Sequence, residues 1–387
     1  MKKIEEIEIL RAIAILLTLM QHLGYLLFPS KELWVALNHN PPFWGGVDLF
    51  FSISGFVICR SLVNSWPSGS ASAHWAETWR FWVRRFFRIV PTLWVWVCLF
   101  LIGAWKFNEA GGFGQLEANI GDAWAAVLNY SNVHIFRCVI GKDACGPNSV
   151  FWSLSLEEQF YLLLPLCLLL PRRVLEVAVA AFILIQLPIR RLPWEDSIGG
   201  ALWFFRTDSM LLGASLAWLA STDFYARAGK KLEACRRFRA PVATVLVLGL
   251  LVVPKSGVPF AAGGLAILSC CLVFLASFNR SFLFGKSLLS KPLVWVGTRS
   301  FSLYLIHMPV MWFINELAFR LSAHPDAYRA PLPNNPFHPF LTVATFAGVF
   351  IVAECNYRWL ETPLRRYGRH LTERAEVGQL RSPAPTR

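Results

Sequence analysis

Charged side chains are scarce in this sequence. Asp, Glu, Lys and Arg make up only 16% of its 387 residues, whereas 55% are hydrophobic, among them 17 Trp and 31 Phe. A soluble domain usually carries about a quarter charged residues. The composition therefore excludes a soluble globular domain and predicts an all-α integral membrane protein, because helices satisfy their own backbone hydrogen bonds in lipid.

Several common signatures are also missing. No group of His and Cys has the spacing of a metal site and no glycine-rich loop suggests a bound nucleotide, so we expect no metal and an activity that resists chelators. Met1-Lys2-Lys3 could open a secretory signal, but acidic residues follow and no small-residue cleavage site appears. We therefore expect the first apolar segment to be retained. No internal repeat is visible.

About ten segments are apolar enough to cross a bilayer as helices, although the shorter ones require tilt or local thinning of the membrane. We expect residues 1–369 to form one transmembrane domain and residues 370–387, which are polar, to form a flexible cytoplasmic tail. The predicted spans are 7–28, 43–63, 91–105, 150–170, 174–189, 201–220, 241–254, 258–277, 300–320 and 338–359.

Lys and Arg gather in the connections that follow the second, fourth, sixth and eighth spans. Positive residues are retained in the cytoplasm, so these connections and both termini are predicted to be cytoplasmic. The formal net charge of +13 follows from this arrangement and does not require a nucleic-acid partner.

The nine cysteines include one close pair outside the spans. Cys138 and Cys145 lie in the longest outer connection, 106–149, where an oxidising compartment would favour a disulfide. The sequence leaves open whether they are joined. The other cysteines are interpreted as packing residues.

The first span carries two ionisable residues, Arg11 and His22. Ionisable groups in a bilayer are costly and usually face the protein interior. Their spacing places both side chains on nearly the same helix face, about 16 Å apart along the axis. With the N-terminus in the cytoplasm, Arg11 is expected near the cytoplasmic end and His22 in the outer half.

Other spans bring charges to a similar outer depth. Asp48 lies on the second span, Glu157 and Glu158 on the fourth, and Arg206 with Asp208 on the sixth. Their convergence suggests a polar cavity open to the outside. The alternative is a set of structural ion pairs, with Arg206 bound to Asp208 or to a Glu, and His22 as a core imidazole bonded to a backbone carbonyl. Glu157 and Glu158 point about 100° apart on a helix, so one is expected to face the cavity and the other to pair with an arginine.

A series of short motifs extends from Glu5 to about Arg366, and their order and spacing resemble the membrane acyltransferases of family 3, which O-acylate bacterial surface carbohydrates and some small molecules. The motifs are Arg11 with His22; Gly46-Val47-Asp48-Leu49-Phe50-Phe51-Ser52-Ile53-Ser54-Gly55-Phe56; Arg85-Phe86-Phe87-Arg88-Ile89-Val90-Pro91; Trp152-Ser153-Leu154-Ser155-Leu156-Glu157-Glu158-Gln159-Phe160; Arg206 with Asp208 and Gly213; Ser300-Phe301-Ser302-Leu303-Tyr304-Leu305-Ile306-His307; and Glu361-Thr362-Pro363-Leu364-Arg365.

The resemblance implies a bundle of ten transmembrane helices with cytoplasmic termini in the bacterial inner membrane. Many members carry a further extracytoplasmic esterase-like domain, which we expect this chain to lack. The resemblance also implies an O-acyltransferase that moves an acyl group, expected to be acetyl, from cytoplasmic acyl-CoA to a hydroxyl of an extracytoplasmic carbohydrate. Exopolysaccharide, lipopolysaccharide O-antigen and other surface or lipid-linked glycans are all suitable acceptors.

The donor would bring phosphates, which the planar fork of Arg binds well. Ordinary positive-inside charge explains the loop arginines equally well. His307 is placed in the cytoplasmic half of its span, where it either lines the donor channel or packs. The residues predicted to bind acyl-CoA are Arg11, Arg84, Arg85, Arg88, Tyr304 and His307.

The acceptor hydroxyl needs a base, and His has a suitable pKa near neutral pH. We predict His22 as the general base, with Asp48, Glu157 or Glu158 holding its tautomer. A rival mechanism makes His22 an acyl carrier. The residues predicted to bind the acceptor are Trp152, Ser153, Arg206 and Asp208.

The sequence is also compatible with other functional classes of membrane protein. A proton-coupled transporter of a small polar solute would also place His, Asp and Glu in a bundle. A flippase or a scaffold for polysaccharide assembly would explain the outer cavity but not the cytoplasmic arginines. Within the enzyme class, the acceptor could be a macrolide-type metabolite or a periplasmic glucan, and the donor could be succinyl. The sequence does not determine the oligomeric state.

Overall fold

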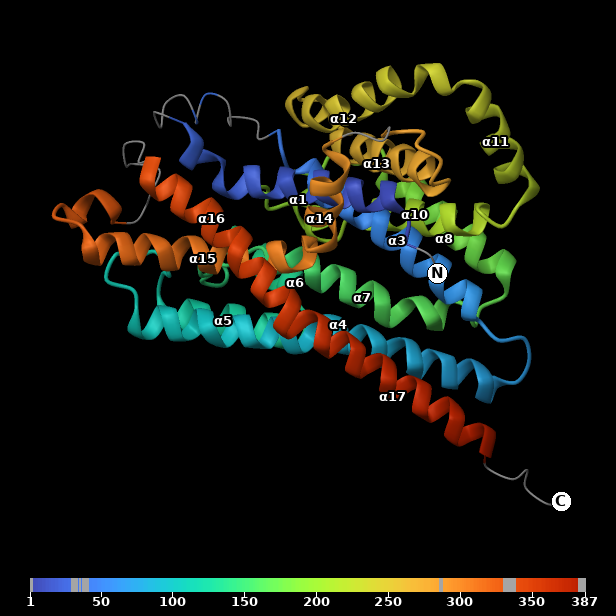
Figure 1. Ribbon diagram of the computed structural model, residues 1–387, viewed down its shortest axis with the longest axis horizontal. Helices are drawn as coiled ribbons and strands as arrows, with labels where there is room; N and C mark the ends of the chain where they lie inside the picture. The colour runs from blue at the N-terminus through green and yellow to red at the C-terminus, as the bar shows by residue number, and fades with distance from the viewer. Residues whose placement is uncertain are drawn as a thin grey trace.

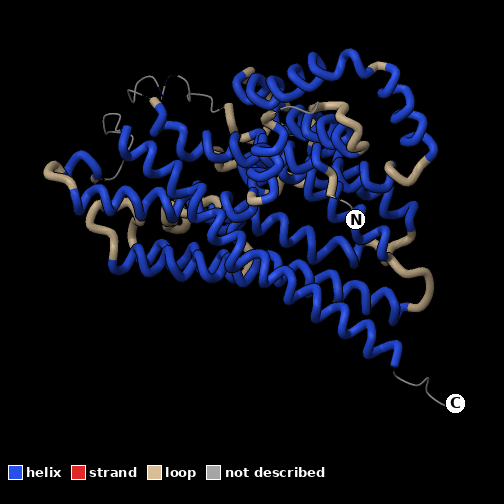
Figure 2. The backbone as a smooth tube through the Cα atoms, in the orientation of Figure 1, coloured by secondary structure: helices blue, strands red, loops and turns tan. Residues whose placement is uncertain are grey.

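The computed structural model describes residues 3–28, 34, 36, 42–284, 288–329 and 339–381. Within these ranges all regular structure is helical (Figure 2). In chain order the elements are α1 (Glu5–Leu23), η1 (Gly24–Leu27), α3 (Gly45–Ser65), α4 (Ala71–Lys106), α5 (Leu116–Val127), α6 (Ser131–Val139), α7 (Phe151–Cys167), α8 (Arg172–Gln186), α9 (Ile198–Phe204), α10 (Asp208–Leu219), α11 (Asp223–Ala234), η2 (Arg236–Phe238), α12 (Arg239–Lys255), α13 (Ala261–Ser277), α14 (Ser290–Thr298), α15 (Ser300–Leu321), η3 (Pro325–Tyr328), α16 (Pro339–Asn356), the π-helical turn η5 (Tyr357–Glu361) and α17 (Thr362–Arg381).

The centre of the bundle is the contact between α3 and α10. A Cβ added to Gly55 would lie 2.0 Å from the carbonyl oxygen of Met210, and one added to Gly213 would lie 2.1 Å from that of Ser52. Small residues allow this close approach of two backbones, which is a common way to pack helices in membranes. The contact brings Asp48 of α3 beside the start of α10.

The other helices surround this centre. In Figure 1, α4, α5 and α17 lie along the lower side of the molecule and α11, α12 and α13 along the upper side. The long helix α4 packs against both α5 and α17, and α1 packs against α3, α14 and α15. Since α7 also packs against α3 and α4, and α15 packs against α4, the helices α1, α3, α4, α7 and α15 meet inside the bundle.

The helices agree with the predicted spans in position. Five described helices are long and apolar enough to cross a membrane, and Ala261–Ser277 is a shorter apolar helix. The protein is thus a helical membrane protein, while the number of ten spans and the cytoplasmic side of the termini stay predictions. The five helices are Glu5–Leu27, Gly45–Ser65, Ala71–Lys106, Arg236–Lys255 and Pro339–Glu373.

One expectation about continuity is wrong. The predicted span 201–220 is not one helix, because α9 ends at Phe204 and α10 begins at Asp208, with Arg206 in the break between them. The first part of the polar segment from residue 370 is helical, because α17 continues to Arg381, and residues 382–387 lie outside the described residues. The flexible cytoplasmic tail stays a prediction.

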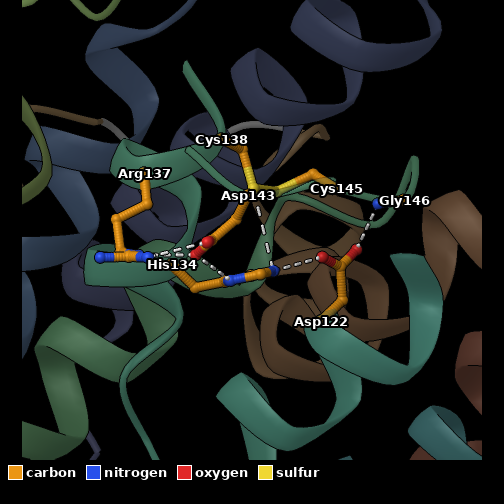
Figure 3. The surroundings of a disulfide bond; sticks show 7 residues. All are labelled: Asp122, His134, Arg137, Cys138, Asp143, Cys145 and Gly146. Atoms are coloured by element: carbon orange, nitrogen blue, oxygen red, sulfur yellow. Dashed lines mark hydrogen bonds and ion pairs between the residues drawn. A yellow bond between two sulfur atoms is a disulfide. The ribbon is translucent and has the colours of Figure 1, made fainter. Parts of the chain in front are cut away.

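Cys138 and Cys145 are joined by a disulfide with a Cα–Cα distance of 5.8 Å, which answers the question that the sequence left open (Figure 3). Beside it, His134 Nε2 lies 3.0 Å from Asp122 Oδ1 and 3.8 Å from Cys138 Sγ. Because the two sulfur atoms are bonded to each other, they are not free to hold a metal together with His134. The buried Asp122–His134 pair joins α6 to α5, and the disulfide joins α6 to the connection that follows it.

Candidate active site

A pocket lies where α1, α3, α4, α7 and α15 meet. Its empty volume is about 650 Å³, part of it open to solvent. The wall is apolar along Val47, Phe50 and Phe51. Its polar residues come from all five helices and are Arg11, Ser54, Arg88, Ser153, Glu157, Tyr161, Ser300 and Tyr304.

Arg11 reaches this pocket from α1. Its Nη1 donates to Glu8 Oε1 at 2.8 Å, and 16% of the side chain is exposed. The pairing with Glu8 uses one nitrogen of the fork, so further donors of the guanidinium can bind a ligand. Arg11 thus forms part of the pocket wall, while its role in binding acyl-CoA stays a prediction.

The three arginines predicted on α4 take different positions. Arg88 lines the pocket. Arg85 lies behind it, with its guanidinium 5.4 Å from the Phe81 ring and 5.6 Å from the Tyr161 ring, and its Nε and Nη1 are buried without a hydrogen-bond partner among the described residues. Arg84 does not line the pocket and donates to Glu77 Oε1 at 2.8 Å. The Arg85–Arg88 spacing therefore places one cation on the wall and one directly behind it.

The neighbouring glutamates separate as their spacing predicts. Glu157 lines the pocket and accepts hydrogen bonds from Ser54 and Tyr161. Glu158 does not line it, and its Oε1 is buried with no partner in the described part of the chain. The expected ion pair of the second glutamate with an arginine is absent among the described residues.

Asp48, Arg206 and Asp208 belong to a separate buried ion network. Arg206 Nη2 lies 3.5 Å from Asp48 Oδ2, and Ser209 donates to Asp48 Oδ1 at 3.1 Å. The alternative of structural ion pairs is thus met in kind but with other partners, because Arg206 lies beside Asp48 and not beside Asp208. Asp208 instead accepts two hydrogen bonds from Arg191, at 3.0 and 2.6 Å, and both side chains are fully buried.

Sequence reasoning did not single out Arg191. The available signal was its position: it follows Arg190 in a connection predicted to lie on the outer side, where positive residues are uncommon. Ser54 and Tyr161 were also not singled out. Their helix spacing could have indicated a place on the pocket wall, because Ser54 lies two turns after Val47 and Tyr161 lies one turn after Glu157.

The Arg206 guanidinium is enclosed by three indole rings. Its central carbon lies 4.1 Å from the centroid of Trp203, 5.1 Å from Trp152 and 5.2 Å from Trp44. Its three nitrogens have no hydrogen-bond partner among the described residues, so the aromatic faces supply much of its stabilisation. Trp152 thus packs on Arg206, while the adjacent Ser153 faces the pocket.

The two histidines lie together. The His22 and His307 ring centroids are 5.3 Å apart, so the expected separation of His22 in the outer half and His307 in the cytoplasmic half is wrong. His307 Nδ1 donates to the Tyr304 carbonyl at 2.6 Å. Tyr304 lines the pocket, and its hydroxyl bonds to Ser153 Oγ at 2.6 Å and to the Val150 carbonyl. Tyr304 and His307 therefore connect the pocket wall to His22.

Among the described residues no hydrogen bond joins His22 to any of the three predicted carboxylates, Asp48, Glu157 and Glu158. Asp48 is bonded to Ser209 and Arg206, and Glu157 to Ser54 and Tyr161, so neither holds the His22 ring in the described part of the chain.

These features define a helical membrane protein with an internal pocket lined by arginines and one carboxylate. A family model described as an acyltransferase domain matches residues 4–354. The chain therefore belongs to this acyltransferase family, as its motifs indicated.

Two curated relatives resemble nearly all of the chain. It is 27% identical over 390 residues to the peptidoglycan O-acetyltransferase OatA of Listeria monocytogenes, an alignment that covers 95% of this chain and 56% of the relative. It is 26% identical over 348 residues to the O-acetyltransferase OatA of Staphylococcus aureus, covering 84% of this chain and 53% of the relative. The chain thus spans just over half the length of these relatives. No solved structure is significantly similar to it.

Proposed function

We propose that the protein is an O-acyltransferase that moves an acetyl group from cytoplasmic acyl-CoA to a hydroxyl of an extracytoplasmic glycan. Membership of the acyltransferase family supports the reaction class. The relatives named as peptidoglycan O-acetyltransferases favour a cell-wall or other surface glycan as acceptor. Multiple spans in the bacterial inner membrane would bring the donor and acceptor sides together.

The observation that carries the proposal is the pocket itself. Arg11 and Arg88 come from different helices and line the same cavity as Glu157 and Tyr304. Two guanidinium groups that line one cavity suit the phosphates of CoA, since each fork can bind phosphate oxygens bidentately. Arg85, with two buried unpartnered nitrogens behind this wall, adds positive potential to the same end.

The reaction itself requires one proton acceptor. In direct transfer, the acceptor hydroxyl gives its proton to His22 while its oxygen attacks the thioester carbonyl carbon. The C–S bond then breaks, and the CoA thiolate takes the proton from His22 and leaves as free thiol. In the rival route the unprotonated nitrogen of His22 attacks the thioester carbonyl carbon, the C–S bond breaks, and the thiolate leaves as free thiol with the ring N–H proton. The acceptor oxygen then attacks the acyl carbon, the N–C bond breaks, and the hydroxyl proton returns to His22.

The test is acetyl-CoA turnover by purified protein in lipid nanodiscs, read as thiol release and as label retained on protein. Arg11→Ala and Arg88→Ala are expected to raise KM for acetyl-CoA by about 10-fold or more, because each removes a charge-assisted hydrogen bond. His22→Ala should abolish thiol release. Arg172→Ala is the matched control, since its side chain is 79% exposed on α8.

Label retained by wild type would favour the acyl-imidazole route. If wild type neither binds nor cleaves any acyl-CoA, the proposal fails and proton-coupled solute flux becomes the next assay.

A further inference from the structure

His307 has an open hydrogen-bond acceptor in the interior of the bundle. The residue is fully buried, and its Nδ1 lies 2.6 Å from the Tyr304 carbonyl oxygen. A carbonyl oxygen can only accept, so Nδ1 carries the proton and Nε2 presents a lone pair. This Nε2 has no hydrogen-bond partner among the described residues.

The imidazole of His22 lies beside the His307 ring. The ring centroids are 5.3 Å apart and the ring planes are inclined by 49°. Two imidazoles joined by an N–H···N hydrogen bond have centroids about 5 Å apart, so this separation suits such a bond.

We propose that His307 is the positioning residue for His22. Its Nε2 accepts a hydrogen bond from one N–H of His22, which fixes the tautomer and leaves the other nitrogen of His22 unprotonated. That nitrogen then takes the proton of the acceptor hydroxyl. The inference rests on the proposed function and supplies the support for His22 that the carboxylates do not give.

A neutral partner suits this position. Asp48 and Glu157 are bonded elsewhere, so His307 Nε2 is the open acceptor beside His22 in the described part of the chain. When His22 becomes protonated, the hydrogen bond to His307 stabilises its charge without a second full charge in the membrane interior. Two imidazolium ions in contact would repel each other, so the pair holds one extra proton.

A packing role explains the same residue less well. A buried ring nitrogen without a partner is unfavourable, and an apolar side chain would fill the space without that cost. The tautomer of His307 is set by its own helix, because Nδ1 donates to the backbone carbonyl of Tyr304 one turn earlier.

The experiment compares His307→Leu and His307→Gln in the nanodisc assay. Leu removes the acceptor, and kcat is expected to fall about 100-fold, within the range for loss of acid–base catalysis, with KM for acetyl-CoA within about 2-fold of wild type. Gln carries an amide oxygen that accepts a hydrogen bond near the position of Nε2, so it should recover at least about 10-fold of the lost kcat. His324→Gln, in an exposed loop after the same helix, is the control and should leave both constants unchanged.

Three results would overturn the inference. In the first, His307→Leu keeps wild-type kcat while His22→Ala is inactive, which leaves the proposed function standing. In the second, Leu and Gln raise KM equally and leave kcat unchanged, which would make His307 a donor-binding residue. In the third, wild type shows no acyl-CoA turnover, and the proposed function fails with it. Acetyl-CoA binding by His307→Gln, measured alongside, verifies folding where Leu is poorly expressed.

Discussion

The ion pair between Arg191 and Asp208 allows a direct test of whether Asp208 is structural or binds the acceptor. Both side chains are fully buried and joined by two hydrogen bonds, at 3.0 and 2.6 Å. Removing one partner leaves the other charge uncompensated, which typically costs about 3–5 kcal/mol. We therefore expect Asp208→Asn to lower the free energy of unfolding by about that amount.

The double variant Arg191→Met with Asp208→Leu distinguishes two effects on the free energy of unfolding: removal of the whole ion pair, and removal of one charge that leaves the other unpaired. Replacing both partners by apolar residues is often neutral or stabilising by about 1–4 kcal/mol, so the double variant should unfold near the wild type. Since neither residue lines the pocket, it should also turn over acetyl-CoA.

The assay is denaturant unfolding in mixed micelles, arranged as a double-mutant cycle with thiol release measured on each variant. Glu176→Gln in the exposed Arg172–Glu176 pair is the control and should cost less than about 1 kcal/mol. The reasoning is refuted if Asp208→Asn is as stable as wild type but no longer transfers the acyl group, because Asp208 would then act on substrate.

Two further predictions concern the outer connection. Replacing Cys138 and Cys145 together by Ser should destabilise this connection by about 2–3 kcal/mol, the value expected for a short closed loop, and limited proteolysis with and without reductant should detect earlier cleavage; equal cleavage rates would contradict it. Burial raises the pKa of Asp122 to about 6, against the hydrogen bonds from His134 and Gly146. The folded state therefore binds the proton of the Asp122 carboxyl more tightly than the unfolded chain does. Protonation of Asp122 contributes its full stabilisation of the folded state below pH 3.8, and this contribution is lost as the pH rises through about 6. Proteolysis rates measured from pH 4 to 7 should rise with pH in wild type and less steeply in Asp122→Asn, and parallel slopes would count against the assignment.

Sequence periodicity predicted the helices well because a membrane helix is a local property of composition. The helix repeat also indicated that Glu157 and Glu158 point apart, although not which of them faces the pocket, and it did not predict that Arg11 and Glu157 line the same pocket. The contacts of Arg191 with Asp208 and of His22 with His307 could not be predicted in this way. Each joins elements far apart in the chain, and their relative depth depends on helix tilt and on the break at Arg206, which hydropathy does not report.

The consecutive residues Trp152 and Ser153 explain why the charges that seemed to converge at one level form two sites. They point about 100° apart on α7. Trp152 covers the Arg206 guanidinium on one side, and Ser153 donates to the Tyr304 hydroxyl on the other. The helix therefore separates a buried ion network between α3 and α10 from a pocket that is partly open to solvent. Substitutions that face the network should change stability first, whereas those that face the pocket should change turnover first, and this division is what the Asp208 and His307 experiments compare.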